Sequence, residues 1–162
     1  MAMAAVVREL FVLLIGAILG VALAQPWTDR VVPMINKPSA KVSSVTVPPV
    51  GREAIISVET GSVLPEHEMY LVVESDGRYW PQSSLEPFSS GTYGVVLGAV
   101  GKGDIGRTFV VMVVDASGPA KSRILDYFNR FEETKVRQFG IDFRRVENKI
   151  KRLDFILLKR DR

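Results

Sequence analysis

Residues 108–115 (TFVVMVVD) carry the strongest strand signal in the chain and decide the fold class. Valine and phenylalanine favour extended backbone, and a short apolar run bounded by turn residues is typical of a strand. Successive side chains of a strand point to opposite faces of its sheet, so an unbroken apolar run predicts burial on both faces. We therefore expect this strand, and the similar run at 71–73 (LVV), at the centre of a sheet.

Directly before this strand, residues 101–106 (GKGDIG) have the spacing G-x-G-x-x-G of dinucleotide-binding loops. Such a loop holds pyrophosphate at the N-terminus of the helix that follows it, where aligned backbone N–H groups converge. Here a strand follows, and a Walker loop would need glycine where Val96 stands. We therefore predict that residues 98–106 form a loop between two antiparallel strands and bind neither nucleotide nor phosphate.

Further short β-rich segments lie upstream, separated by turn residues. Residues 69–75 and 78–82 flank Asp76-Gly77, a two-residue signal for a hairpin. The remaining strands are expected at 42–47, 54–60 and 92–97. Short strands at this close spacing predict an antiparallel β-sandwich or barrel, not alternating βαβ units.

The C-terminal third changes to a helical period. Pro119, following Ser117 or Gly118 as the cap, predicts a helix over about 119–132. Its apolar side chains recur at helical spacing and are Ile124, Leu125, Phe128 and Phe131. After a break at Phe139-Gly140, residues 153–158 (LDFILL) predict a last strand. The helix is thus expected as an insertion before the final strand, covering one end of the sandwich.

Two stretches carry a family resemblance. Residues 69–82 (MYLVVESDGRYWPQ) end in an aromatic strand, and residues 106–116 (GRTFVVMVVDA) contain a G-x-x-F-x-V strand. This order resembles small immunoglobulin-like β-sandwich modules of prokaryotic single-pass membrane-tethered proteins. Over residues 43–159 it implies an immunoglobulin-like antiparallel β-sandwich. With the helix predicted above, the expected fold is mainly β, an immunoglobulin-like sandwich with one inserted C-terminal α-helix, preceded by a single N-terminal transmembrane helix. Such modules are mostly non-catalytic. This chain departs from antibody-type domains in its inserted helix and in having no cysteine pair.

The N-terminus predicts a membrane segment. Residues 10–24 (LFVLLIGAILGVALA) contain no strongly polar side chain, and residues 1–27 are long enough for a transmembrane helix that ends at Pro26. The alternative is a signal peptide, because Ala22-Leu23-Ala24 fits the small-x-small cleavage pattern. Residues 28–41 contain two prolines and no clear period, so they are expected to form a tether to a domain over 42–162.

Flanking charge predicts the orientation of this helix. Only Arg8 precedes its apolar part, whereas three cations follow it, namely Arg30, Lys37 and Lys41. The positive-inside rule keeps the more basic flank in the cytoplasm, so we expect the domain there.

Small residues four apart on the same helix predict how it packs. Gly16, Gly20 and Ala24 form a small-xxx-small row that lets a second helix approach closely. The expected neighbour is another membrane protein or a second copy of the chain.

Charge is distributed unevenly along the chain. Residues 42–118 hold 4 Lys/Arg against 9 Asp/Glu, whereas residues 119–162 hold 13 against 7. A basic tail near a membrane anchor favours contact with anionic lipid headgroups, with a merely solvated face as the alternative. The cations expected to face lipid are Arg30, Lys37, Lys41, Arg144, Arg145, Lys149, Lys151 and Arg152. Acidic residues interrupt the tail and no aromatic residues interleave with it, so nucleic acid is not an expected partner.

Composition excludes several kinds of chemistry. The chain has no cysteine and one histidine, which excludes disulfides, thiolate metal sites and histidine-rich metal clusters. The single cluster of ligand-type side chains, Glu66-His67-Glu68, is expected to be solvated loop. Serine catalysis has no G-x-S-x-G elbow. We therefore expect no enzyme, no cofactor and no metal.

Aromatic residues crowd the middle strands. Tyr79 and Trp80 are adjacent, so their side chains must point to opposite faces of a sheet, and Pro81 after them suggests an edge strand. We expect one ring in the core and one exposed, with core packing of Trp80 as the alternative. Tyr79, Trp80 and Tyr93 are therefore candidate docking residues for a partner.

Together these features predict a non-catalytic, membrane-anchored interaction module, an accessory subunit of a membrane protein complex. The alternative is a secreted or envelope carbohydrate-binding β-sandwich whose signal peptide has been cleaved. The fate of Ala24-Gln25 separates the two.

Overall fold

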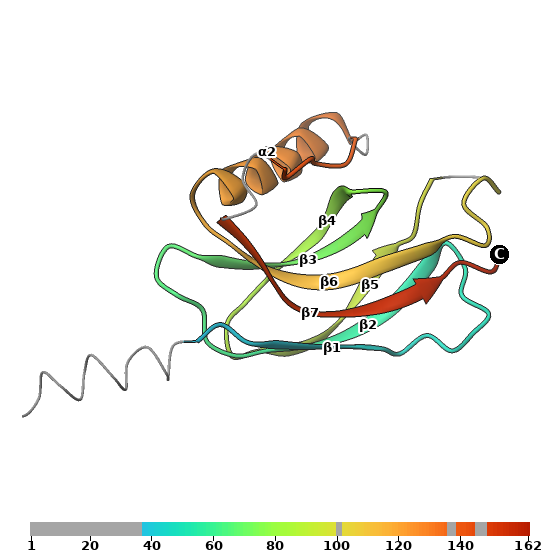
Figure 1. Ribbon diagram of the computed structural model, residues 1–162, viewed down its shortest axis with the longest axis horizontal. Coiled ribbons are helices and arrows are strands. Elements are labelled where there is room, and N and C mark those ends of the chain that lie inside the picture. Colours follow the sequence, from blue (N-terminus) through green and yellow to red (C-terminus); the bar gives the residue numbers. More distant parts are fainter. Residues whose placement is uncertain (1–36, 100–101, 136–138, 145–148) are drawn as a thin grey trace, which may run out of the picture. The chain divides into compact units, whose positions relative to one another are not determined.

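The computed structural model describes residues 37–99, 102–135, 139–144 and 149–162 (Figure 1). The predicted membrane helix with Gly16, Gly20 and Ala24, most of the tether with Arg30, and Arg145 all lie outside these ranges. Within the described ranges, no helix combines the length and apolar character needed to cross a bilayer. Residues from Pro38 onward form one compact unit.

Seven strands form two antiparallel sheets. The first sheet has the order β1-β2-β5, with β1 at Ala40–Ser44, β2 at Glu53–Thr60 and β5 at Ser90–Val96. The second has the order β4-β3-β6-β7, with bounds Arg78–Leu85, Glu68–Ser75, Thr108–Ala116 and Ile150–Lys159. The predicted mainly β, antiparallel sandwich is confirmed at this level, and so is the hairpin at Asp76-Gly77.

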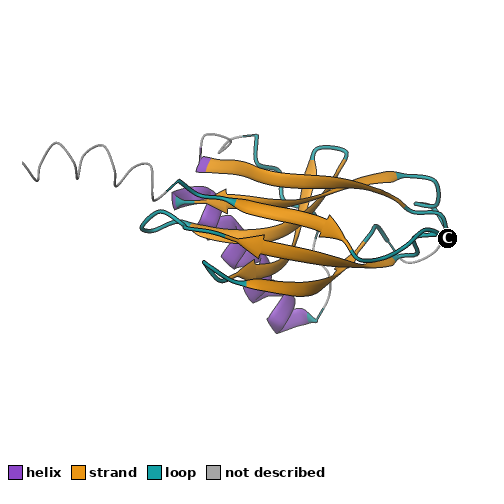
Figure 2. Cartoon of the chain, turned by 90° about the horizontal axis from the view of Figure 1, so that it is seen from below, coloured by secondary structure: helices purple, strands orange, loops and turns teal. Residues whose placement is uncertain are grey.

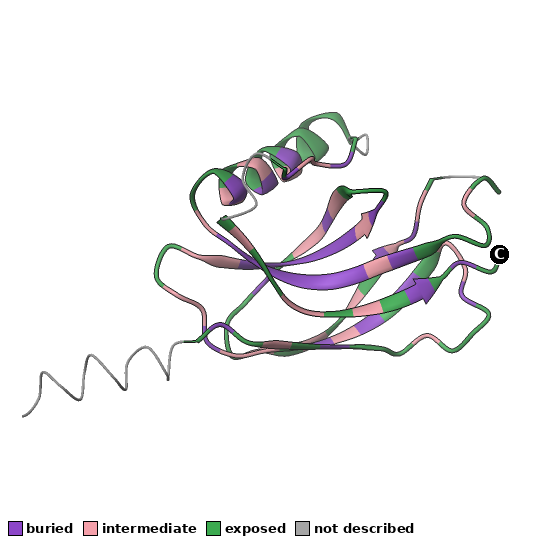
Figure 3. Ribbon diagram, in the orientation of Figure 1, coloured by how far each residue is buried: buried purple, intermediate pink, exposed green. Residues whose placement is uncertain are grey.

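The central strands β3 and β6 are buried on both faces, as their apolar runs predict (Figure 3). Alternate residues such as Leu71 and Val111 face the other sheet and form the core of the sandwich. Their neighbours Tyr70 and Met112 point the other way, into a second apolar layer. One sheet therefore separates two cores.

Helix α2 (Gly118–Thr134) forms the far side of the second core. Ser117 occupies the N-cap position, and Lys135 ends the helix in the left-handed conformation with its N–H donating to the Phe131 carbonyl. The predicted position was wrong. The helix lies across the outer face of the four-stranded sheet and does not cover one end of the sandwich (Figure 2). An outer face with Tyr70 and Met112 must be covered, and the helix covers it.

The predicted apolar stripe of the helix is confirmed in part, because Ile124 is buried and Phe128 packs against the second core. Ala120, Ile124 and Tyr127 are its buried residues, whereas Leu125 and Phe131 are 40% and 38% exposed.

The glycine-containing segment before β6 is a loop, as predicted, because turns precede β6 where a dinucleotide-binding fold would have a helix. The two strands that it joins lie in different sheets, so the loop crosses from β5 of one sheet to β6 of the other.

Two β-bulges connect the edges of the sheets. In β4 the pairing skips Gln82, whose side-chain oxygen accepts a hydrogen bond from the Val96 N–H of β5 at 3.1 Å. In β7 the pairing skips Leu153, and next to it Asp154 accepts from the Val42 N–H of β1 at 2.7 Å. A bulge redirects a side chain, and here each directs a polar group to the opposite sheet.

A candidate binding cleft at one end of the sandwich

A cleft of about 590 Å³ opens between the two sheets, at the end where the loop 97–107 and the β3–β4 hairpin lie. Its walls include the apolar side chains of Val73, Trp80, Val96 and Phe109. Its charged residues are Arg52, Asp76, Arg78, Asp104 and Arg107. Apolar walls with a few convergent polar groups are typical of ligand sites, and the volume is in the usual range.

Trp80 forms one wall because β4 holds its ring on the inner face of the sheet, opposite Val73. Behind the ring, a Cβ at Gly140 would come within 2.6 Å of it, so the backbone of the segment at 139–144 packs directly on the indole. Arg78 donates to the Gly140 carbonyl at 3.1 Å, and Tyr79 forms a β-bridge with Ile141. This segment fixes the position of Trp80.

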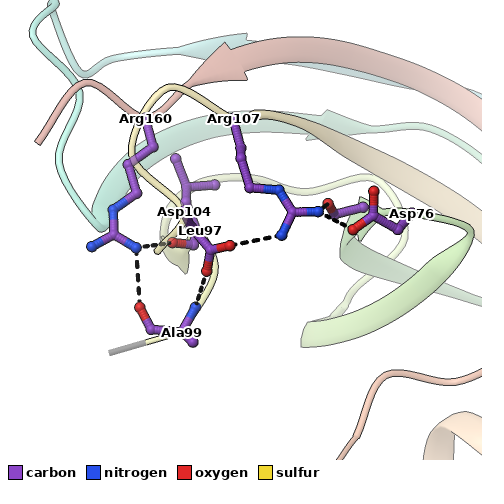
Figure 4. Close-up of polar contacts among 7 residues, drawn as sticks. Asp76, Leu97, Ala99, Asp104, Arg107 and Arg160 are labelled. Atoms are coloured by element: carbon purple, nitrogen blue, oxygen red, sulfur yellow. Dashed lines mark hydrogen bonds and ion pairs between the residues drawn. The ribbon is translucent and has the colours of Figure 1, made fainter. Parts of the chain in front are cut away.

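The loop on the other side of the cleft is organised by Asp104 (Figure 4). Its carboxylate accepts from the Ala99 N–H at 2.7 Å and from Arg107 Nη1 at 2.8 Å. These two contacts, the backbone N–H first, lower the pKa of Asp104. Arg107 also pairs with Asp76 and donates to Ser75 Oγ, so it links the loop to the β3–β4 hairpin.

Arg160 holds the same loop from the opposite side. Its side chain is buried, with 4% exposed, and Nη1 donates to the carbonyls of Leu97 and Ala99 at 3.3 and 3.0 Å. The carbonyl of Arg160 accepts from the Gly106 N–H at 2.6 Å. Gly106, the last glycine of the pattern, is therefore part of an internal network of hydrogen bonds.

Arg52 differs from the other arginines of the cleft. Its Nε is buried and has no hydrogen-bond partner among the described residues. Arg107 is paired with two carboxylates, and Arg78 donates to a carbonyl. Arg52 lines the cleft and forms no ion pair among the described residues, so its guanidinium is the cationic group of this cleft that is available to an anionic ligand.

The three predicted docking aromatics do not form one surface. Tyr79 and Trp80 point to opposite faces, as predicted, and Tyr79 packs edge-on against Phe143 in the second core, with ring centroids 5.1 Å apart. Tyr93 packs against the core between the sheets. Trp80 alone lines the cleft.

The predicted lipid-facing cations divide into two places. β1 and β7 run side by side in the same direction, as the contacts Val42–Asp154 and Val50–Asp161 show, and they begin at the same end (Figure 1). The exposed cations at that end are Lys41, Lys149, Lys151 and Arg152, whereas Lys37 precedes Pro38, where the compact unit begins. Arg144 lies near the β3–β4 hairpin instead, where it pairs with Asp142 and lowers the pKa of that carboxyl group.

The residues around His67 are not simply solvated, contrary to expectation. His67 Nδ1 lies 2.9 Å from a carboxylate oxygen of the buried Asp115. Glu68, the first residue of β3, accepts from the Tyr70 hydroxyl and pairs with Lys121 of α2 at 2.7 Å. Both contacts lower the pKa of Glu68. They join strand and helix, and no group of three metal-ligating side chains occurs in the described ranges.

Sequence reasoning missed Arg52, Gln82, Asp104 and Arg160. Each has an ordinary sequence context, and a local pattern cannot show that three distant loops converge. The one available signal was that an acidic residue stands inside a glycine-rich loop.

Comparison with known proteins gives no match: no family model, no curated protein and no solved structure is similar to this chain.

The Asp104 network leads to a pH prediction. Because the folded pKa of Asp104 is lowered, its carboxylate stabilises the fold above the ordinary aspartate pKa of about 4, and this contribution is lost as the pH falls through the folded pKa. Asp104→Asn should lower the free energy of unfolding by about 1–3 kcal/mol at pH 7. The difference from wild type should narrow below about pH 4 in urea titrations.

Asp76→Asn is the matched control, because Asp76 is 71% exposed while Asp104 is 13% exposed, and both pair with Arg107. An exposed ion pair contributes about 0–1 kcal/mol. Equal losses for the two variants would show that the loop does not depend on the Asp104 bonds.

Proposed function

We propose that this chain is a non-catalytic, membrane-anchored interaction module with an immunoglobulin-like sandwich, acting as an accessory subunit of a membrane protein complex. The strand order supports the fold assignment. A constant-type immunoglobulin domain places strands one, two, five and four in one sheet and strands three, six and seven in the other. Six strands follow that assignment here, and β4 differs because it pairs with β3.

The observation that carries the functional proposal is the separation of two unlike ends. Exposed cations gather where β1 and β7 begin, at the end that follows the tether in sequence. The cleft is lined by residues of the loop 97–107 and of the hairpin. In Figure 1 these two segments lie away from the starts of β1 and β7. A tethered module of this design places basic residues near anionic headgroups, at about 1 kcal/mol for each cation close to the surface. In this arrangement the cleft faces away from the headgroups.

Cytoplasmic placement follows from the same cations. Arg30 and Lys37 of the predicted tether and Lys41 of β1 favour an inward-facing domain by the positive-inside rule, and the cytoplasmic leaflet is the anionic one. The predicted helix row Gly16, Gly20, Ala24 then supplies a contact with a membrane partner or a second copy.

A secreted carbohydrate-binding domain is the second candidate, and Trp80 is the observation that favours it, because aromatic rings stack on sugars. Tyr79 and Tyr93 pack against the two cores, which leaves one ring where an extended platform would need several. N-terminal sequencing of the native protein separates the candidates, since a mature chain beginning at Gln25 would have lost the anchor.

Photo-crosslinking tests the proposed module. We expect benzoylphenylalanine at position 80 of the full chain to give one adduct in native membranes. The crosslinked protein should be a membrane protein that also co-purifies with the unmodified chain in mild detergent. Ile55 is the matched control, because it is 52% exposed on the outer face of the other sheet. The same adducts from both positions, or none from position 80, would contradict the proposal.

A further inference from the structure

We propose that the cleft recognises an acidic segment of a partner polypeptide, with a carboxylate against Arg52 and an adjacent apolar side chain against Trp80. This inference rests on the proposed interaction function and specifies the chemistry of the partner.

The charges of the cleft favour an anion. Its lining residues include three arginines and two aspartates, and Asp76 and Asp104 both pair with Arg107. Arg78 donates to a neutral carbonyl and joins Arg144 in lowering the pKa of the neighbouring Asp142. The Arg52 Nε, in contrast, has no hydrogen-bond partner among the described residues. The charged lining residues therefore sum to +1, and Arg52 is the arginine among them that is not engaged by a carboxylate of the described residues. A guanidinium presents its donors in a planar fork that matches a carboxylate in a bidentate arrangement.

The walls define the remainder of the ligand. Val73, Val96, Phe109 and the Trp80 ring line the cleft, and the backbone at Gly140 packs closely against that ring. A cleft of about 590 Å³ holds two or three side chains, so the fitting ligand is a short segment and not a folded surface. An apolar residue next to the carboxylate would remove these walls from water.

The position of the cleft favours a polypeptide over a lipid. The predicted lipid-facing cations at the starts of β1 and β7 lie at the opposite end of the sandwich. A headgroup held by Arg52 would require the other end of the module to approach the membrane. A partner segment that projects from a membrane complex has no such restriction.

Fluorine NMR of the full chain in detergent micelles tests the inference directly. The chain has two tryptophans, Trp27 and Trp80, so 5-fluorotryptophan labelling gives two resonances, and Trp80→Phe assigns them. The probe is acetylated, amidated leucyl-glutamyl-leucine, and its control is the same tripeptide with glutamine. We expect the glutamate peptide to shift the Trp80 resonance saturably and the Trp27 resonance not at all.

Two variants locate the anion. Arg52→Gln should weaken binding of the glutamate peptide about tenfold to a hundredfold, which is the range expected for a hydrogen bond to a charged group. Lys102→Gln is the matched control, because it removes an exposed cation from the neighbouring loop without touching the cleft, and it should leave the affinity within about threefold, since exposed charges contribute little.

Each other outcome overturns the inference. Equal affinity for the glutamate and glutamine peptides, measured on the unmodified chain, would show that no carboxylate is recognised, even if Arg52→Gln fails to fold. An equal shift with acetate would remove the role of the apolar walls, and an equal shift with anionic phosphatidylglycerol would assign the cleft to lipid. Crosslinking at position 80 that persists after any of these results would leave the interaction module standing with a different partner chemistry.

Discussion

Replacing Ile124 by alanine should lower the free energy of unfolding by about 2–5 kcal/mol. Ile124 is a residue of α2 and is 0% exposed. It packs on the outer face of β3 and β6, in the layer that contains Tyr70 and Met112. Truncation removes apolar contacts and leaves a cavity that a packed helix cannot fill. Urea unfolding of the detergent-solubilised full chain, followed by circular dichroism, measures the change.

Leu125→Ala is the matched control, because Leu125 is the next residue of the same helix and is 40% exposed. Leu125→Ala removes the same kind of side chain, but one with little buried contact. The free energy of unfolding should therefore fall by less than about 1 kcal/mol. Similar losses at positions 124 and 125 would mean that the helix does not pack on the sheet in this orientation.

Gly98→Ala is the second large effect, with an expected loss of about 2–4 kcal/mol. Gly98 has φ +78°, a region that costs an alanine roughly 1–2 kcal/mol. A Cβ there would also meet Asp104, which must then move away from the Ala99 N–H that it accepts. Loss of that charge-assisted bond supplies the remainder. Thermal or urea unfolding measures the sum.

Two other glycines separate the contributions. Gly77 has φ +71° with nothing near its Cβ position, so Gly77→Ala should show the backbone cost of about 1–2 kcal/mol alone. Gly103 has open space and no positive φ, so Gly103→Ala should change stability by less than about 1 kcal/mol. An equal cost at positions 98 and 77 would show that Asp104 does not constrain the loop.

The sandwich could be predicted from the sequence because its signals are local. Residues 109–114 within the run 108–115 are apolar at every inner and outer position, and the structure places them between two cores. Asp76-Gly77 predicted its hairpin from the turn residues alone. The preference of a segment for a strand depends on each residue and its nearest neighbours. It can therefore be predicted from the sequence without knowledge of the tertiary structure.

The position of the helix was not predictable in the same way. Its apolar stripe shows that one face is buried but not which surface covers it. The outer faces of β3 and β6 supplied the missing signal, since Tyr70 and Met112 cannot both be left in water. The sequence predicted that 108–115 is buried on both faces, which required a layer on each side of that sheet. It did not show that the helix forms the outer layer.

The candidate site could be predicted only in part. Trp80 was identified from its aromatic strand, whereas Arg52 stands in an unremarkable segment before β2. The residues that line the cleft are scattered between positions 52 and 109. They come together only because certain strands form the edges at which the two sheets lie next to each other. That arrangement follows from the bulge at Gln82 and from the crossing loop, neither of which has a sequence signature.

The two bulges affect how the sheet edges of this chain can meet those of a second molecule. A free strand edge is a template on which a neighbouring polypeptide can add a strand, and this is a common route to aggregation. In the three-stranded sheet, the Val42 and Val96 donors are bonded to Asp154 and Gln82 of the same chain, and in the other sheet Ile141 occupies the Tyr79 edge. A strand from a neighbouring molecule would first have to displace these bonds. Edge-to-edge polymerisation is therefore disfavoured at these positions.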